Sequence, residues 1–208
     1  MRALTPELHR LFVREARKIS PVFGKTLEAI GPIGYQGRRT RDFATHLARI
    51  IVGQQLSTLA AKSIWTRVES AAEHLPRTLD LFVESNEPAL RACGLSGAKI
   101  RALLGLRDAD SAGQLDARKL ARLSHEARRE ALVKLRGIGP WTADMVSMFY
   151  FHEPDIWPIG DLAVRKTFER FVSAHDEYDL HTGAARFAPY RSFLALYMWR
   201  IANNGPDE

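Results

Sequence analysis

The segment "KLRGIGPWTADMV", residues 134–146, places two glycines around one isoleucine, followed by a proline and a tryptophan. Upstream of it, Ser124 is a suitable N-cap for the helix-forming run "HEARREALVKL". Pro140 fits the first position of a second helix, where its missing N–H costs no hydrogen bond. Gly137 and Gly139 allow a tight turn and the close approach of another backbone. The segment therefore predicts two helices joined by a sharp corner.

The exposed N–H groups of this corner suggest a binding function. Those of Gly137, Gly139 and the first turn of the second helix lack intrahelical acceptors and lie at the positive end of the helix dipole. A DNA phosphate is a suitable acceptor there, and such a contact does not depend on base sequence. We expect Ile138 to turn inward and pack between the helices. The alternative is a glycine-rich corner without a ligand.

The rest of the sequence also predicts helices, with no convincing strand pattern. We expect helices capped by Thr5, Thr40, Ser57 and Ser96, and further helices over residues 161–172 and 189–202. The predicted fold class is all-α. Residues 1–208 are expected to form a single unit with two lobes, approximately 40–120 and 1–39 plus 121–208.

Composition narrows the class of protein. The 208 residues include 30 Lys and Arg against 24 Asp and Glu, a net charge of +6 that suits an anionic partner, although many basic proteins bind no DNA. The single cysteine, Cys93, leaves no disulfide within the chain and no cysteine-ligated iron–sulfur cluster. The sequence contains no membrane-span or signal-peptide pattern. We expect a cytoplasmic protein without a membrane partner.

Several segments resemble a known family. Residues 135–143 resemble the helix–hairpin–helix signature of the DNA glycosylase superfamily. The matching residues are Leu135, Gly137, Ile138, Gly139, Trp141, Thr142 and Ala143. The segments "IIVGQQLSTLAAKSIW" (50–65), "PYRSFLALYMW" (189–199) and, less specifically, "GLSGAKIRAL" (94–103) are similar to the 3-methyladenine DNA glycosylase II branch. Residues 1–39 are too few and too helical for the extra N-terminal domain of the larger bacterial enzymes. The resemblance implies a compact, two-lobed helical fold with the active-site cleft between the lobes.

The resemblance also implies a catalytic aspartate, roughly twenty residues beyond the hairpin. The segment "DIWPIGDLAVRK" places Pro158 three positions before Asp161, which matches that context. A carboxylate beside C1′ of the sugar stabilises an oxocarbenium-like charge and can orient or deprotonate water. The alternative for Asp161 is an ordinary helix N-cap. We expect Asp144, Glu153 and Asp155 to be structural or solvent-facing.

Position 141 predicts the type of glycosylase. Members that also cut the DNA strand carry a lysine there, whose amine forms a Schiff base with the sugar. This chain has Trp141 instead. The resemblance therefore implies a monofunctional hydrolase without lyase activity, which leaves an intact abasic strand.

The expected substrate is an alkylated purine such as 3-methyladenine or 7-methylguanine, flipped out of duplex DNA in base excision repair. Trp141 and Met145 share one helix face, and Trp199 stands where the family has a second aromatic residue. Aromatic rings attract a cationic base through its charge. Leu162 completes the predicted base pocket. The alternative for the methionines is simple core packing, which we favour for Met148.

Other residues are expected to contact the DNA. The resemblance implies that a residue of the stretch "GQQLS" fills the gap left by the flipped base, and we expect this wedge to be Gln55, or else Leu56, while Gln54 braces the turn. The alternative is that the two glutamines are exposed turn residues or backbone hydrogen-bonders. At the hairpin, the residues expected to bind DNA are Gly137, Ile138, Gly139 and Thr142, with Lys134 and Arg136 adding positive charge. We expect the protein to bind damaged double-stranded DNA as a monomer near the bacterial nucleoid.

No catalytic metal or organic cofactor is expected, because the seven histidines show no ligand spacing. The resemblance does imply a structural Na⁺ or K⁺ on the carbonyls of Val133, Leu135 and Ile138. Two alternatives stay open. One is a glycosylase for oxidised, deaminated or mismatched bases, and the other is a non-catalytic helix–hairpin–helix DNA-binding module.

Overall fold

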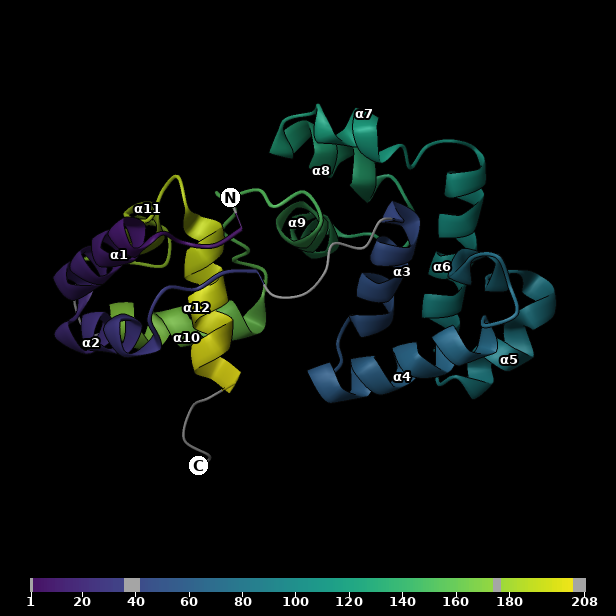
Figure 1. Ribbon diagram of the computed structural model, residues 1–208, viewed down its shortest axis with the longest axis horizontal. Helices are drawn as coiled ribbons and strands as arrows, with labels where there is room; N and C mark the ends of the chain where they lie inside the picture. Colours follow the sequence, from purple (N-terminus) through teal and green to yellow (C-terminus); the bar gives the residue numbers. More distant parts are fainter. Residues whose placement is uncertain (1, 36–41, 174–176, 204–208) are drawn as a thin grey trace. The chain divides into compact units, whose positions relative to one another are not determined.

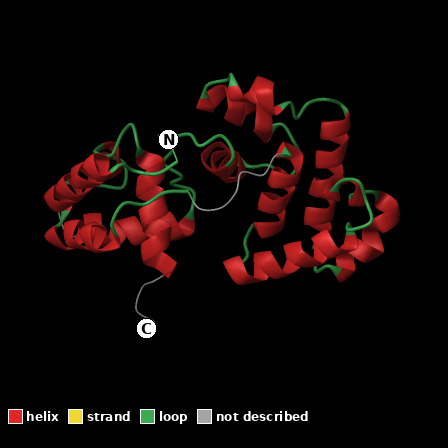
Figure 2. Cartoon of the chain, viewed as in Figure 1, coloured by secondary structure: helices red, strands yellow, loops and turns green. Residues whose placement is uncertain are grey.

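The computed structural model describes residues 2–35, 42–173 and 177–203. Over these residues the chain forms α-helices and two short 3-10 helices, and its β structure is limited to an isolated bridge between Ala3 and Gly34. Figure 2 shows this helical architecture. The predicted all-α fold is confirmed. None of the described helices is long and apolar enough to cross a membrane.

The chain divides into two compact units. We call Met1–Arg38 with Ser147–Glu208 the terminal unit, and Arg39–Val146 the central unit. The boundary between them falls inside one helix, α9 (Pro140–Phe149). Each unit has its own buried apolar core and is described separately below.

The terminal unit is built from helices at both ends of the chain (Figure 1). They are α1 (Pro6–Ile19), α2 (Pro21–Ile30), α10 (Leu162–Val172), α11 (Thr182–Ala185) and α12 (Arg191–Asn203). Thr5 caps α1 as predicted, because its hydroxyl accepts the Leu8 N–H at 3.3 Å. The sequence did not predict α2, which begins at Pro21 directly after the end of α1. The core includes the stacked rings of Phe23 and Phe171, with centroids 4.4 Å apart.

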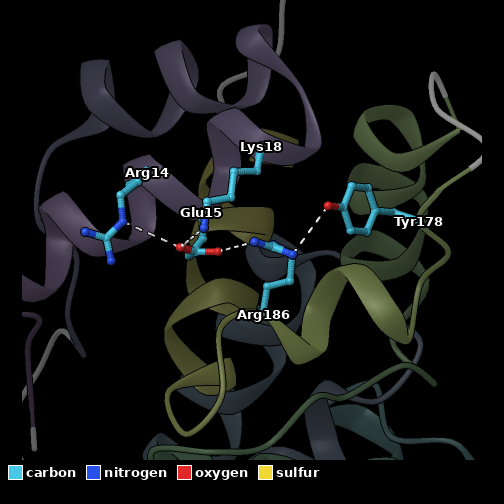
Figure 3. Close-up of polar contacts among 5 residues, drawn as sticks. All are labelled: Arg14, Glu15, Lys18, Tyr178 and Arg186. Atoms are coloured by element: carbon cyan, nitrogen blue, oxygen red, sulfur yellow. Dashed lines mark hydrogen bonds and ion pairs between the residues drawn. The ribbon is translucent and has the colours of Figure 1, made fainter.

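A polar cluster joins α1 to the segment that follows α11 (Figure 3). The Glu15 carboxylate accepts hydrogen bonds from Arg186 and, at 2.8 Å, from Lys18. Arg14 lies 3.6 Å from the same carboxylate, and Arg186 also donates to the Tyr178 hydroxyl at 3.3 Å. Burial alone would raise the pKa of Glu15, but these hydrogen bonds and charges outweigh it, so the pKa lies below its ordinary value.

The central unit contains the helices between these two ends (Figure 1). They are α3 (Phe43–Gly53), α4 (Thr58–Ala71), η1 (Thr78–Leu81), η2 (Glu84–Asn86), α5 (Glu87–Ala92), α6 (Gly97–Ser111), α7 (Ala117–Ala121), α8 (His125–Val133) and the start of α9. The predicted caps Ser57, Ser96 and Ser124 are confirmed for α4, α6 and α8. For α3 the cap is Asp42, which accepts the Thr45 N–H, whereas the predicted Thr40 lies outside the described residues.

The division differs from the lobes expected over residues 121–146. The sequence grouped this segment with the chain termini, whereas in the structure it belongs to the central unit. The reason is that residues of this segment contact residues far away in the sequence. The Gln54 side chain, just after α3, donates to the Gly137 carbonyl and the Thr142 hydroxyl. Gly137 in turn lies against Ala102 of α6.

Candidate functional site

The first part of the candidate site is the hairpin, formed by α8, residues 134–139 and α9. Pro140 begins α9, as the sequence predicts. Gly137 has φ +82°, and a Cβ added there would lie 2.3 Å from the Cβ of Ala102. A side chain at this position is therefore excluded by both backbone conformation and space. At Gly139, by contrast, an added Cβ meets no described atom within 4 Å.

The hairpin buries Ile138 and leaves two of its backbone N–H groups without an acceptor in the described part of the chain. Ile138 is 5% exposed and its N–H donates to the Leu135 carbonyl at 3.1 Å, so its predicted inward packing is confirmed. The N–H groups of Gly137 and Gly139 have no acceptor among the described residues. They remain available to a group outside the unit. The flanking side chains of Lys134 and Arg136 are exposed.

Thr142 differs from its expected place on the DNA-facing surface. Its side chain is 2% exposed, and its hydroxyl accepts a hydrogen bond from Gln54 Nε2 at 2.9 Å. The side chain therefore contributes to the interior of the central unit. Any DNA contact of this residue must come from its backbone.

The second part is the turn from Gln54 to Ser57 between α3 and α4, which we call the wedge turn. Gln55 has a left-handed backbone, φ +56°, and both Gln55 and Leu56 are exposed. Gln54 braces the turn as predicted, because its Nε2 donates to the Gly137 carbonyl at 3.0 Å and to Thr142. The two wedge candidates thus lie at the surface of a turn attached to the hairpin.

Lys99 is a residue of this region that the sequence analysis did not single out. Its ammonium donates to the carbonyl of Val52 at 2.7 Å and to that of Gln54 at 2.9 Å. One sequence signal could have revealed it. Lys99 lies in the first turn of α6, where a positive charge is unfavourable next to the helix N-terminus unless it has a partner.

The third part lies in the terminal unit and centres on Asp161. Asp161 is the N-cap of α10, and its Oδ1 accepts the Val164 N–H at 3.0 Å. The same oxygen accepts the indole N–H of Trp199 at 3.1 Å. The turn before it closes through the Asp161 N–H and the Pro158 carbonyl, 2.8 Å apart. The structure thus brings two predicted site residues, Asp161 and Trp199, into direct contact.

Apolar surface adjoins this carboxylate. Leu162, the next residue along the chain, is 55% exposed. The ring of Phe149 at the end of α9 lies with its centroid 5.7 Å from that of Trp199 and is 37% exposed. Phe149 was not predicted, although it follows Met145 by four residues and Trp141 by eight, on one helix face. Exposed aromatic surface therefore occurs next to a fixed carboxylate.

The remaining predicted residues of the base pocket belong to the central unit. Trp141 is half-buried in the first turn of α9, and Met145 is buried one turn further on. Met148, in the terminal unit, is fully buried, so its predicted role in the core is confirmed.

Two of the other acidic residues near the motif, Asp155 and Asp144, have structural partners, as predicted. Asp155 receives the Arg191 guanidinium at 2.7 and 2.8 Å; burial raises its pKa, but the hydrogen bonds from Arg191 outweigh this and lower it. Asp144 is buried, 3.4 Å from His125 and 3.8 Å from Arg129. The described residues contain no group of three or more His, Cys, Asp or Glu side chains that could hold a metal ion.

An all-α fold with this hairpin, followed by an aspartate at a helix N-cap, defines the class of helix–hairpin–helix DNA glycosylases. No protein-family model matches the chain. It is 30% identical over 170 residues to DNA-3-methyladenine glycosylase 1 of Schizosaccharomyces pombe, covering 75% of this chain and 71% of the relative. The chain therefore belongs to the DNA-3-methyladenine glycosylase family.

Two solved structures are similar to this chain over most of its length. A DNA-3-methyladenine glycosidase from Bacillus halodurans superimposes with a TM-score of 0.75 at 27% identity, covering 98% of this chain and 94% of the other. The 3-methyladenine DNA glycosylase of S. pombe in complex with abasic DNA gives a TM-score of 0.76 at 23% identity, with 94% and 99% coverage. The second likeness supports the fold.

Proposed function

We propose that this protein is a DNA glycosylase that removes alkylated purines, of the 3-methyladenine and 7-methylguanine type, from duplex DNA in base excision repair. The names of its relatives support the substrate class, and the S. pombe structure contains the product of such a reaction, abasic DNA. The observation that carries the proposal is the Asp161 carboxylate, fixed by two N–H donors and flanked by aromatic surface.

The proposed chemistry is hydrolysis of the bond between C1′ and the base nitrogen. The bonding electrons leave with the base, and positive charge develops on the sugar. The Asp161 carboxylate stabilises that charge and orients the water that adds to C1′. The water gives one proton to the Asp161 carboxylate, which then releases it to solvent, and the products are a free base and an abasic nucleotide. The bonds from Val164 and Trp199 hold the carboxylate in one orientation, so it need not reorganise during the reaction.

Alkylated purines suit this arrangement for two reasons. A methyl group on a ring nitrogen makes the base cationic, which weakens the glycosidic bond before the enzyme acts. A cation is also attracted to aromatic faces by about 0.5–2 kcal/mol. Trp199 and Phe149 supply such faces in the terminal unit, and we assign the same task to Trp141 in the central unit, with Met145 and Leu162 as apolar lining.

The proposed enzyme has no lyase activity. Strand cleavage of the lyase type needs an amine that attacks C1′. Trp141 occupies the position where strand-cutting relatives have a lysine, and its indole nitrogen cannot form a Schiff base. The abasic strand should therefore remain intact.

DNA binding is assigned to the hairpin and the wedge turn. The unpartnered amides of Gly137 and Gly139 suit a phosphate, and Lys134 and Arg136 add positive charge. Gln55 or Leu56 would fill the gap left by the extruded base. We propose that one copy of the chain binds one duplex lesion.

A structural Na⁺ or K⁺ at the hairpin is part of the proposal. Such ions are bound by neutral oxygen ligands, and the carbonyls of Val133, Leu135 and Ile138 are ligands of this kind. The Leu135 carbonyl already accepts the Ile138 N–H and keeps a second lone pair. The ion would order the turn and add positive charge near a bound phosphate.

The test is base release from methylated duplex DNA by the wild-type protein. Released bases are identified by chromatography, and the strands are sized before and after hot alkali. We expect 3-methyladenine or 7-methylguanine in solution and strand breaks only after alkali. Breaks before alkali, trapped by borohydride, would contradict the hydrolase-only mechanism. Release from oxidised or deaminated duplexes but not from methylated ones would contradict the substrate class.

A further inference from the structure

The wedge turn is held in place by a lysine from another helix. The Lys99 ammonium of α6 donates to the carbonyls of Val52 and Gln54, at 2.7 and 2.9 Å. These carbonyls lie at the C-terminal end of α3, where carbonyls lack intrahelical partners and the helix dipole is negative. Lys99 therefore closes the end of α3 immediately before Gln55.

Without the hydrogen bonds to these two carbonyls, the position of the Lys99 ammonium would be unfavourable. Its charge lies in the first turn of α6, at the positive end of that helix. Burial lowers the pKa of its ammonium. The two carbonyl contacts offset both costs, which explains why the ammonium is directed into the protein and away from water.

The wedge turn has a second attachment, made by the side chain of Gln54. The backbone carbonyl of the same residue is the one that Lys99 contacts. Both N–H groups of the Gln54 amide have acceptors, the Gly137 carbonyl at 3.0 Å and the Thr142 hydroxyl at 2.9 Å. Gln54 is thus bound to α6 through its carbonyl and to the hairpin through its side chain. The next residue, Gln55, is exposed with φ +56°.

We infer that Lys99 is a positioning residue for extrusion of the damaged nucleotide, holding Gln55 and Leu56 in the conformation that enters the DNA. The inference rests on the proposed function. A wedge that is already ordered pays no entropy for ordering when it displaces a base. Because Gln54 links the turn to the hairpin, a phosphate bound at the hairpin and a wedge in the base stack are kept in one register.

A phosphate-binding lysine is the alternative, and it makes different predictions. Loss of a phosphate contact weakens binding to every duplex and lowers the salt dependence of binding by about one unit of slope. Loss of a positioning contact leaves binding to undamaged DNA unchanged and slows the step in which the base leaves the stack. The two roles can be separated by measuring binding and extrusion independently.

The experiment compares Lys99→Met, Lys99→Arg and the control Lys119→Met with the wild type. Lys119 is exposed on α7, so its substitution removes the same charge without touching the wedge turn. Three quantities are measured: the Kd for undamaged duplex over a salt series, the fluorescence of a 2-aminopurine beside the lesion, and the single-turnover excision rate at saturating enzyme.

For Lys99→Met we expect an unchanged Kd and salt slope, with extrusion and excision about tenfold slower, as for the loss of a charge-assisted hydrogen bond. Lys99→Arg keeps donors and should restore part of both. Lys119→Met should extrude and excise like the wild type. A fall in affinity for undamaged DNA that accounts for the whole effect would overturn the inference, and so would normal extrusion by Lys99→Met.

A second variant covers the case in which Lys99→Met does not fold, judged by circular dichroism. Gln54→Glu keeps the side-chain size and replaces both amide donors with acceptors facing the Gly137 carbonyl. It should show the same extrusion defect with Lys99 intact, and normal extrusion would overturn the inference. Extrusion is read by fluorescence without catalysis. A wild type that extrudes the base but releases none would therefore contradict the proposed function while leaving the inference testable.

Discussion

At the scale of single residues, the two glycines of the hairpin have different reasons to be glycine. Gly137 is required by the fold, since its φ is +82° and its Cα faces Ala102. Gly139 has open space around it among the described atoms and no positive φ. The protein interior therefore does not explain Gly139, whereas a phosphate approaching its N–H would.

This contrast gives a paired prediction. Gly137→Ala should lower the free energy of unfolding by about 3 kcal/mol, from left-handed strain and overlap with Ala102. Gly139→Ala should change it by less than about 0.5 kcal/mol yet weaken duplex binding about tenfold, because the added Cβ would keep a phosphate from approaching the backbone N–H, which alanine retains. Chemical denaturation and fluorescence anisotropy measure the two effects. Wild-type DNA affinity in Gly139→Ala would argue against a phosphate at that amide.

Trp199 gives a second prediction at this scale. Trp199→Phe keeps a ring beside Phe149 but removes the N–H bond to Asp161, so excision should slow about tenfold while DNA binding is retained. Trp157→Phe is the matched control. The indole nitrogen of Trp157 is buried with no hydrogen-bond partner among the described residues, so its loss should not slow excision. Equal rates for the two variants would show that the Trp199 bond does not position the carboxylate.

At the scale of helices and turns, the sequence predicted what local signals encode. Thr5, Ser57, Ser96 and Ser124 begin helices because a hydroxyl followed by an apolar periodic run is a local cap signal. Helix α2 was not predicted, and neither were the short helices α5, α7 and α11. Helices of this length depend on tertiary packing more than on propensity, and their sequences carry little periodic signal.

The contacts that organise the site are of the kind that sequence cannot show. Gln54 reaches Gly137 across 83 residues, and Lys99 reaches the Gln54 carbonyl across 45. The bracing role of Gln54 was predicted from the sequence, but its hydrogen-bond partners were not. Asp161 was predicted as a site residue and, alternatively, as an N-cap. The structure confirms the cap, which does not compete with the proposed catalytic role because one carboxylate can serve both.

The contact between α1 and Arg186 carries a prediction about pH (Figure 3). The pKa of Glu15 is depressed in the folded protein, so its ionised form contributes stability above the unfolded value of 4.5. That contribution is lost as the pH falls through the lower folded value. Glu15→Gln should cost about 2 kcal/mol at neutral pH, and the difference from the wild type should shrink below pH 4.5.

The control for this prediction is Glu28→Gln. Glu28 pairs with Arg17 at 2.7 Å, but both side chains are more than half exposed, so the loss should be within about 1 kcal/mol. Urea denaturation at several pH values measures both variants. A Glu15→Gln deficit that stays constant down to pH 3 would mean that the carboxylate charge does not stabilise the fold.

At the scale of the whole molecule, the residues proposed for DNA binding and those proposed for catalysis come from different parts of the chain. The central unit carries the hairpin and the wedge turn, both suited to DNA without regard to sequence. The terminal unit carries Asp161, Trp199 and Phe149, suited to the chemistry at the sugar and base. Helix α9 contributes residues to both units, with Trp141 and Met145 in the central unit and Phe149 in the terminal unit.

Resemblance of short motifs predicted the family, and a relative that matches 75% of the chain shows it. The lobe boundaries were the weaker inference, because residues 121–146 pack by contacts that no local pattern encodes. Net charge alone, +6 over 208 residues, indicated only an anionic partner. The hairpin motif and the aspartate after it were the signals that predicted a DNA glycosylase.

The most direct test of catalysis by Asp161 is the single-turnover rate of 7-methylguanine release by Asp161→Asn at saturating enzyme, with the Kd for the same duplex. Asparagine is also a good N-cap and its amide oxygen can accept the Trp199 N–H, so the change removes the charge while these two hydrogen bonds can be kept. Asp116→Asn, at the N-cap of α7, is the matched control. We predict a loss of about 100-fold or more in rate with unchanged Kd for Asp161→Asn, and no loss for Asp116→Asn. A wild-type rate in Asp161→Asn would contradict the mechanism and leave Asp161 as a helix cap.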